Sequence, residues 1–232
     1  TWGTNSITID SNGLNYQGQD DGYDVEYTTD GQSVQIVYAD STKGWIPIND
    51  DDATDVPVQV DQNGIFGFGT TGSSVATTNL VSNAGVVATD VSGVGTARQH
   101  MGACEYSAGQ AKAILAFGDD GSLTAVSNLI SNVGVVAADV SGVGTARSGL
   151  GSMHYDDDKG LMAFGNVSGG VTNLSNKISN VGVVATDTSG VGTARRYLAG
   201  TQYGGDKGIM AYGSSSTGSG TDVSISNLVS NT

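Results

Sequence analysis

Short, almost wholly apolar stretches alternate along the chain with polar stretches rich in glycine and serine. One of them, GLMAFG, spans residues 160–165. In an extended strand Met162 and Phe164 point to one side, and Leu161 and Ala163 point to the other. Both faces are therefore apolar, which predicts a strand that neighbouring sheets cover on both sides.

The same order of segments recurs along most of the chain. Ser-Asn pairs begin at residues 82, 131, 179 and 230, so the spacings are 49, 48 and 51 residues. Each unit opens with an apolar segment, GVVATD (85–90), GVVAAD (134–139) or GVVATD (182–187), which is apolar on both faces until its last residues. A turn, a variable stretch ending near a tyrosine, a strand like GLMAFG, a polar loop and a strand around NLVSN follow. Repeats of this length are typical of propeller and kelch-type proteins, so we expect four short strands per unit in stacked sheets.

The heptapeptide SGVGTAR occurs unchanged at residues 92–98, 141–147 and 189–195. An aspartate stands eight residues before each arginine, in the pairs Asp90–Arg98, Asp139–Arg147 and Asp187–Arg195. The glycines permit a tight turn, and we expect this turn to bring each carboxylate to the guanidinium of its pair. The arginine would then be architectural, either as an ion pair or by bonding turn carbonyls. A repeated ligand-binding arginine is the alternative, although a binding site needs only one copy.

Residues 1–56 break the repeat pattern. Four strands are predicted there, at residues 6–10, 24–28, 34–40 and 44–48, with turns at SNGLNYQG and TTDGQ. A polar run ending in DDDATDVP marks a boundary near residue 56. The sequence thus predicts an all-β protein with a small module at 1–56 and a repeat array at 57–232. The array divides into a half unit (57–84) and units at 85–133, 134–181 and 182–232.

Composition limits the classes of partner. The 23 acidic and 9 basic residues give a formal net charge of −14, which opposes binding to nucleic acid or to anionic membranes. The acidic excess is typical of a marine or extracellular setting. The single cysteine, Cys104, excludes an internal disulfide and is expected to be a small buried residue. The chain opens on Thr1 rather than Met and stops inside the repeat pattern, so we expect a segment of a longer polypeptide.

Candidate chemistry is sparse. His100 and His154 occupy similar but not equivalent places in their units, and they lack the convergent partners of a metal site. The acidic runs at 49–52 and 156–158 show no calcium-loop spacing, which favours solvated turns over calcium ligation.

Catalytic motifs give no better candidate. The only glutamates, Glu26 and Glu105, lie in different regions, so a glycosidase pair of carboxylates would have to use aspartates. No hydrolase, phosphate-binding, zinc-peptidase or dinucleotide motif is present. We therefore assign no catalytic residue, no metal site and no cofactor.

Two segments resemble a known family. Asn5–Gly13 and Thr29–Trp45, in TWGTNSITIDSNGLNYQG and YTTDGQSVQIVYADSTKGWIPI, resemble a module of tail-fibre proteins of tailed bacteriophages. The repeats are similar to glycine-rich arrays of marine phage appendages. More distantly, TAR…Y…KGLMAFG resembles the kelch pattern of an arginine, a central tyrosine and an aromatic–glycine strand end. Kelch repeats carry a glycine doublet and a tryptophan, whereas this chain has single glycines and no such tryptophan.

The phage resemblance implies a structural, non-enzymatic part of a virion, extracellular and usually trimeric, that contacts other virion proteins and a host-surface glycan or protein. Residues that differ between repeats are the expected contacts: His100, Met101, His154, Tyr155, Arg196, Tyr197 and Tyr203. Three and a half units are too few to close a propeller, so further units or further chains would have to complete one. The alternatives are a subunit of a cellular extracellular filament or adhesin, and a polysaccharide depolymerase.

Overall fold

The structure is a computed structural model that describes residues 6–19, 25–29, 33–48, 64–107, 112–156, 158–219 and 221–230. These residues form 15 strands in six small antiparallel sheets and contain no helix, which confirms the all-β prediction. Accordingly, none of them belongs to a helix that could cross a bilayer. The chain divides into two compact units, Thr1–Val60 and Asp61–Thr232, and the boundary expected near residue 56 lies outside the described residues.

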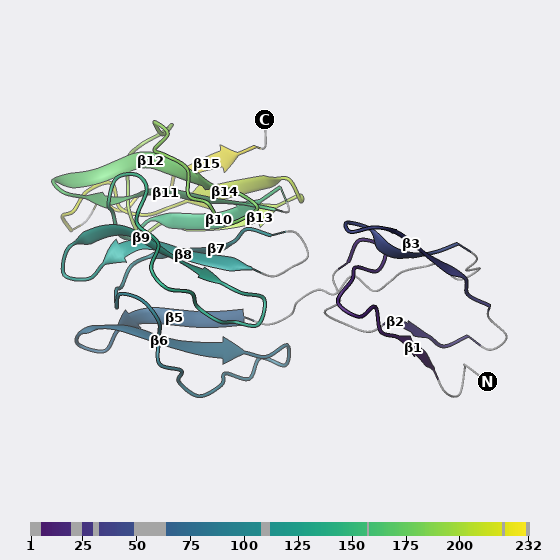
Figure 1. The fold of residues 1–232 in the computed structure, drawn as a ribbon. Coiled ribbons are helices and arrows are strands. Elements are labelled where there is room, and N and C mark those ends of the chain that lie inside the picture. Colours follow the sequence, from purple (N-terminus) through teal and green to yellow (C-terminus); the bar gives the residue numbers. More distant parts are fainter. Residues whose placement is uncertain are drawn as a thin grey trace. The chain divides into compact units, whose positions relative to one another are not determined.

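The amino-terminal unit consists of two strand pairs (Figure 1). Its strands are β1 (Ile7–Ile9), β2 (Val25–Tyr27), β3 (Ile36–Asp40) and β4 (Gly44–Pro47), which confirms the four predicted strands at shorter lengths. The hydroxyl groups of Tyr16 and Tyr27 lie 2.7 Å apart in the core of this unit. At Gly44 the backbone has φ +67°, and a Cβ there would lie 1.6 Å from the Asn15 carbonyl oxygen. Glycine is therefore required where this loop meets β4.

The second unit contains four successive sheets that lie one above the other (Figure 1). The first sheet is β5 (Gly64–Thr70) and β6 (Ser74–Val81). The second is β7 (Gly102–Glu105), β8 (Ala113–Asp119) and β9 (Leu123–Ile130). The third is β10 (Gly151–Tyr155), β11 (Lys159–Val167) and β12 (Gly170–Ile178), and the fourth is β13 (Ala199–Tyr203), β14 (Lys207–Ala211) and β15 (Ser226–Val229). In each three-stranded sheet the strands pair in chain order.

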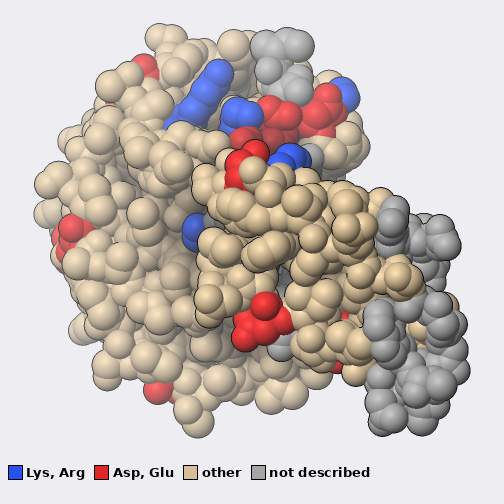
Figure 2. Space-filling model, turned by 45° about the vertical axis from the view of Figure 1, so that its right-hand side comes forward, with Lys and Arg blue, Asp and Glu red and all other residues tan. Residues whose placement is uncertain are grey.

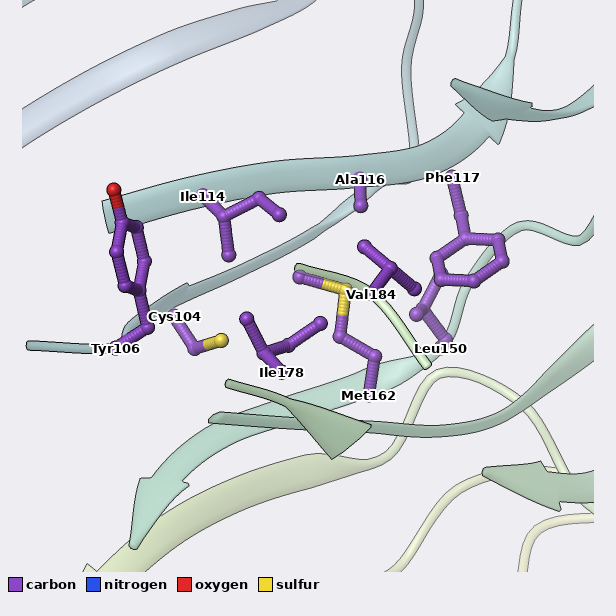
Figure 3. Close-up of a cluster of buried hydrophobic side chains, with 9 residues drawn as sticks. All are labelled: Cys104, Tyr106, Ile114, Ala116, Phe117, Leu150, Met162, Ile178 and Val184. Atoms are coloured by element: carbon purple, nitrogen blue, oxygen red, sulfur yellow. The ribbon is translucent and has the colours of Figure 1, made fainter. Parts of the chain in front are cut away.

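The hydrophobic core lies between successive sheets. Figure 3 shows Cys104 and Ile114 of the second sheet facing Met162 and Ile178 of the third. Ile114 and Met162 have no solvent exposure, and each buried side chain of this size contributes about 1.5–3 kcal/mol. Leu161, on the opposite face of β11, is also buried and packs toward the fourth sheet. The prediction that the GLMAFG strand is covered on both faces is confirmed. Phe164 was wrongly expected on the Met162 side, because the bulge between Ala163 and Gly165 interrupts the alternation and places Phe164 with Leu161 and Ala163.

Cys104 is buried, as expected, in the joint between the second and third sheets. A Cβ at Gly160 would lie only 2.6 Å from the Cys104 sulfur. The glycine at this position of β11 therefore makes room for the thiol. Burial raises the pKa of Cys104 to about 12, and the side chain behaves as a small apolar group.

The segment that opens each repeat in the sequence belongs to the preceding sheet. Val136 and Val140 form isolated bridges to β9, so residues 134–140 lie along the outer edge of the second sheet. They form no regular strand, and only one face is covered, because Val136 is 7% exposed and Val135 is 61% exposed. The other face of the segment contacts solvent, and the expectation that this segment is a regular strand was wrong.

Candidate functional site

The first glycine of SGVGTAR lies against the outer strand of the sheet that comes before the arginine. A Cβ at Gly93 would lie 1.4 Å from the carbonyl oxygen of Ala76 in β6. One at Gly190 would lie 1.3 Å from the corresponding oxygen of Asn173 in β12. Because the obstructing atoms are backbone, no rotamer change can relieve the contact. This steric limit explains why the residue is glycine in every copy.

The arginine of SGVGTAR is the centre of a buried network. Arg98 has no solvent exposure and donates to Asn128 Oδ1 at 2.6 Å, to the Phe117 carbonyl at 2.9 Å and to the Leu115 carbonyl at 3.3 Å. These acceptors lie in the sheet that Arg98 precedes. Its guanidinium carbon also lies 4.8 Å from the ring centroid of Phe68, which belongs to the sheet before. The arginine thus joins two successive sheets.

The same joint recurs in the next two repeats. Arg147 and Arg195 are fully buried, and each guanidinium carbon lies 4.1 Å from an aromatic centroid, that of Phe117 or of Phe164. Phe117 has φ +64° at a bulge in β8, and the amide of the following Gly118 donates to the Arg147 carbonyl at 2.9 Å. Each joint therefore combines a stacked guanidinium with a backbone hydrogen bond. This geometry favours the architectural interpretation of the arginines.

The aspartate partner differs from the one expected. Arg98 pairs with Asp139 at 3.9 Å, and Arg147 pairs with Asp187 at 3.7 Å. In each case the carboxylate lies one repeat further along the chain rather than eight residues before the arginine. The physical reason is the sheet boundary: the arginine begins a sheet and the aspartate ends the outer edge segment of that same sheet. The predicted pairs Asp90–Arg98, Asp139–Arg147 and Asp187–Arg195 do not form.

Hydrogen bonds hold Asp139 in the ionised form. Its oxygens accept from the Thr96 amide at 2.9 Å, from Thr96 Oγ1 at 2.7 Å and from Asn128 Nδ2 at 2.9 Å. Burial alone raises the pKa of Asp139, but the bonds from Thr96 and Asn128 outweigh it and lower the pKa below its usual value. A Cβ at Gly95, where φ is +98°, would lie 2.4 Å from Asp139 Oδ1, so the second glycine of the heptapeptide is also required.

At the two ends of the array the network has other partners. Asp90 accepts from Asn79 Nδ2 at 2.7 Å, as its equivalents do from Asn128 and Asn176. Arg195 donates to Asn227 Oδ1 at 2.8 Å and to the Thr193 carbonyl at 3.1 Å. Within the described residues neither Asp90 nor Arg195 has an ion-pair partner.

The residues two positions after each arginine meet in space. They are His100, Gly149 and Tyr197, and all three have left-handed backbone angles, with φ of 54°, 60° and 55°. The Gly149 amide donates to the His100 carbonyl at 2.7 Å, and the Tyr197 amide donates to the Gly149 carbonyl at 2.7 Å. Three successive sheets are therefore connected by backbone bonds at the start of their first strands.

Two of these side chains and a neighbour form a group at the surface, which we name the rim cluster: His100 and Tyr197, which are exposed, and Arg196, which is half-buried. The rings of His100 and Tyr197 pack edge to face with centroids 5.6 Å apart. Gly149 leaves room for this contact, because a Cβ there would lie 2.8 Å from the Tyr197 ring. The Arg196 guanidinium carbon lies 4.9 Å from the Tyr197 centroid, and Tyr197 is 53% exposed.

Sequence reasoning selected these three residues only as variable positions and did not predict that they meet. The signal that identifies two of them is their equal offset from the repeated arginine. His100 and Tyr197 lie two repeats apart in the chain, and their contact depends on how the intervening sheet is stacked.

The other expected contact residues lie elsewhere. His154 is half-buried on β10, Met101 is half-buried beside the cluster of Leu115, and Tyr203 is 42% exposed at the far end of β13. Tyr155 is 4% exposed and packs between the third and fourth sheets, so it cannot present a contact surface. The expectation for Tyr155 was wrong because the end of β10 folds into the core.

Charged side chains occupy a small part of the face in Figure 2, with acidic and basic groups side by side in one area. In the acidic turn after β10, Lys159 Nζ lies 2.7 Å from Asp156 and 2.8 Å from Asp158, so one lysine offsets part of the negative charge. Asp157 and the run at 49–52 lie outside the described residues. Across the part of the chain that is described, no three His, Cys, Asp or Glu side chains gather as metal ligands would.

A shallow groove of about 650 Å³ lies between the hairpin tips of the second and third sheets. Its lining includes Leu123 and Leu174 together with Thr145 of the second SGVGTAR turn. The lining is mostly apolar and contains no charged side chain. The rim cluster therefore offers more chemistry for recognition than this groove does.

Comparison with known proteins supplies the fold but not the role. No family model and no curated protein matches the chain. Among solved structures 122 chains match, and one is titled "Structure of YjhT". It has 10% sequence identity and a TM-score of 0.51 over 66% of this chain and 48% of that chain. The present chain thus corresponds to about half the length of that structure, and at this identity the likeness shows the fold alone.

Proposed function

We propose that this chain is a structural, non-enzymatic component of a phage tail fibre or similar virion appendage, and that its rim cluster contacts a glycan or protein on the host surface. One observation carries the proposal. The repeated arginines Arg98, Arg147 and Arg195 are buried in joints between sheets, whereas His100, Arg196 and Tyr197 vary between repeats and gather at one place on the surface. A rigid scaffold that presents variable side chains is the usual arrangement of a recognition protein.

The chemistry of the rim cluster supports recognition. Tyrosine and arginine are enriched among the residues that dominate binding energy at interfaces. Tyr197 offers an exposed ring, and Arg196 offers guanidinium donors beside it. The backbone bonds from His100 to Gly149 and from Gly149 to Tyr197 hold the cluster in place, so a ligand does not have to order a loose loop.

Labelled electron micrographs test where the protein resides. Antibodies raised against this chain are applied to phage particles, filaments and cells from the source material. Label on fibres attached to virions supports the proposal. Label confined to free polymers or to cell surfaces supports the filament or adhesin alternative and contradicts the virion assignment.

Adsorption tests which surface makes contact. The double variant Arg196→Ala/Tyr197→Ala is expected to bind host cells at least tenfold more weakly than the native protein. Tyr203→Ala is the control, because Tyr203 is exposed at the far end of β13. Equal binding by the double variant and the native protein contradicts the proposed contact surface. Release of new reducing ends from host polysaccharide would instead indicate a depolymerase.

We also propose that the chain forms homo-oligomers, with a trimer in keeping with the fibre resemblance. The fourth sheet leaves apolar side chains uncovered: Tyr212 is 64% exposed and Leu228 is 71% exposed. Tyr212 occupies the position at which Phe117 and Phe164 each receive an arginine from the following repeat. Contiguous apolar surface marks an interaction site, and we propose that these two side chains belong to one.

A further inference from the structure

Arg196 differs from the other arginines of the described residues. Arg98, Arg147 and Arg195 have no solvent exposure and serve the joints between sheets. Arg196 is partly exposed and forms no ion pair with any acidic residue that the structure describes. Among the described residues the one hydrogen-bond acceptor of its side chain is the Thr217 carbonyl, at 2.9 Å from Nη2.

Two lysines beside turns, unlike Arg196, form ion pairs with aspartates. Lys159 lies between Asp156 and Asp158, and Lys207 lies 2.5 Å from Asp206. The chain carries 23 acidic residues against 9 basic ones. In so acidic a protein, a surface guanidinium without a carboxylate partner keeps donors for an anion from outside.

We infer that the rim cluster binds an acidic sugar unit, that is, a pyranose carrying a carboxylate or a sulfate. This inference rests on the proposed function and specifies the class of ligand. The free guanidinium donors of Arg196 hold the anionic group in a forked hydrogen bond. The exposed ring of Tyr197 packs against the apolar face of the sugar, and His100 supports that ring from its edge.

The position of Arg196 supports this assignment. Its Nε is buried and has no hydrogen-bond partner, so the stem and the inner part of the guanidinium are already desolvated. The Thr217 carbonyl and the Tyr197 ring fix the plane of the group. A pre-oriented guanidinium loses little conformational freedom on binding, and a desolvated one attracts an anion more strongly than a hydrated one does.

The net charge of the protein makes the single charge of Arg196 decisive for an anionic ligand. A net charge of −14 repels an anionic ligand at a distance, and only the short-range pairing with Arg196 compensates. Replacing the charge at this one residue should therefore change the preference for acidic sugars far more than it changes binding to neutral ones.

The test measures binding of the full chain to two matched pairs of probes by calorimetry. The first pair is oligogalacturonate and its carboxyl-reduced derivative, and the second is dextran sulfate and dextran. The native protein is expected to bind an acidic member at least tenfold more tightly than its neutral partner. Arg196→Gln should abolish this preference, and Arg196→Lys should restore part of it, because a lysine keeps the charge without the fork.

Two further variants separate the contributions. Lys177→Gln removes one positive charge from an exposed position on β12 and should leave the preference unchanged. Tyr197→Ala should weaken binding of the acidic and the neutral probe by similar factors. Circular dichroism confirms that each variant keeps the β-sheet signal of the native protein.

Equal affinity for acidic and neutral members of both pairs overturns the inference, as does binding to none of the four probes. An acidic preference that survives Arg196→Gln overturns it as well. In each case adsorption to host cells is measured in parallel. If adsorption persists and still depends on Tyr197, the proposed function stands and only the ligand class is wrong. If adsorption is absent, the proposed function itself fails.

Discussion

At the scale of single residues, specific contacts explain four of the seven unchanged positions of the heptapeptide. Gly93 meets a backbone oxygen, Gly95 meets a carboxylate, Thr96 donates to that carboxylate and Arg98 fills the joint between sheets. The sequence alone predicted that the arginine is architectural and that the glycines are needed. The sequence predicted the wrong carboxylate partner for Arg98. Asp90 is nearer in the sequence, but Asp139 ends the outer edge segment of the sheet that Arg98 begins.

The first prediction concerns the glycine contact. Gly142→Ala would place a Cβ 2.5 Å from the backbone carbonyl of Ala125, so β9 and the turn must separate. We expect a loss of about 1–3 kcal/mol in the free energy of unfolding, measured with urea. Gly64→Ala is the matched control, because its nearest neighbour, a Val81 side-chain atom, is at 3.6 Å, an ordinary contact. A loss no larger than that of the control contradicts the contact.

The second prediction concerns acid. Burial raises the pKa values of Asp139 and Asp187, but hydrogen bonds from threonine and asparagine lower them by more. Both pKa values are therefore lower in the folded than in the unfolded chain. Their stabilisation is present above the unfolded value of about 3.9 and is lost as the pH falls through the folded pKa. Asp139→Asn/Asp187→Asn should therefore flatten the decline of unfolding free energy as the pH falls below about 5.

The control for that experiment is Asp90→Asn, since Asp90 has an asparagine donor but no arginine partner among the described residues. At pH 7 it should lose less unfolding free energy than either single variant at Asp139 or Asp187. A double variant with the native pH dependence would show that these carboxylates do not stabilise the fold.

At the scale of strands and sheets, apolar runs predicted most elements correctly. The strands expected at 6–10, 34–40 and 44–48 correspond to β1, β3 and β4, and AILAFG corresponds to β8. The phase of the repeat was not predictable in this way. A period gives the length of a structural unit but not the residue at which it begins, so the opening segment was placed in the wrong sheet.

The third prediction tests that assignment with neighbouring valines. Val136→Ala should cost about 1.5–3 kcal/mol of unfolding free energy, because Val136 is 7% exposed and packs against Leu115 and Ile130. Val135→Ala should change it by less than about 0.5 kcal/mol, because Val135 is 61% exposed. Equal costs for the two variants would contradict a one-sided edge segment.

At the scale of the whole molecule, the sequence predicted stacked sheets but not the place where variable residues meet. The stacking follows from strands that are apolar on both faces, as β8 and β11 are. The contact between His100 and Tyr197 follows from the rotation and spacing of successive sheets, and neither quantity is encoded in a local pattern. The rim cluster could therefore be identified only from the structure.

The fourth prediction concerns self-association. Leu228→Asp places a charge on the uncovered surface of the fourth sheet, where Leu228 is 71% exposed. We expect the dissociation constant of the oligomer to rise at least tenfold in analytical ultracentrifugation. Val191→Asp is the control, because Val191 is 82% exposed but lies in an SGVGTAR turn. A native oligomer that is unaffected by Leu228→Asp would exclude this surface as the interface.

The central claim is that invariant residues build the scaffold and that one cluster of variable residues meets the ligand. Oxidative footprinting of the free and the cell-bound protein tests it most directly. We predict that His100 and Tyr197 become protected on binding, while Tyr203 and the amino-terminal Tyr38, each 42% exposed, are oxidised equally in both states. Protection of Tyr203 or Tyr38 with no change at His100 and Tyr197 would contradict the account.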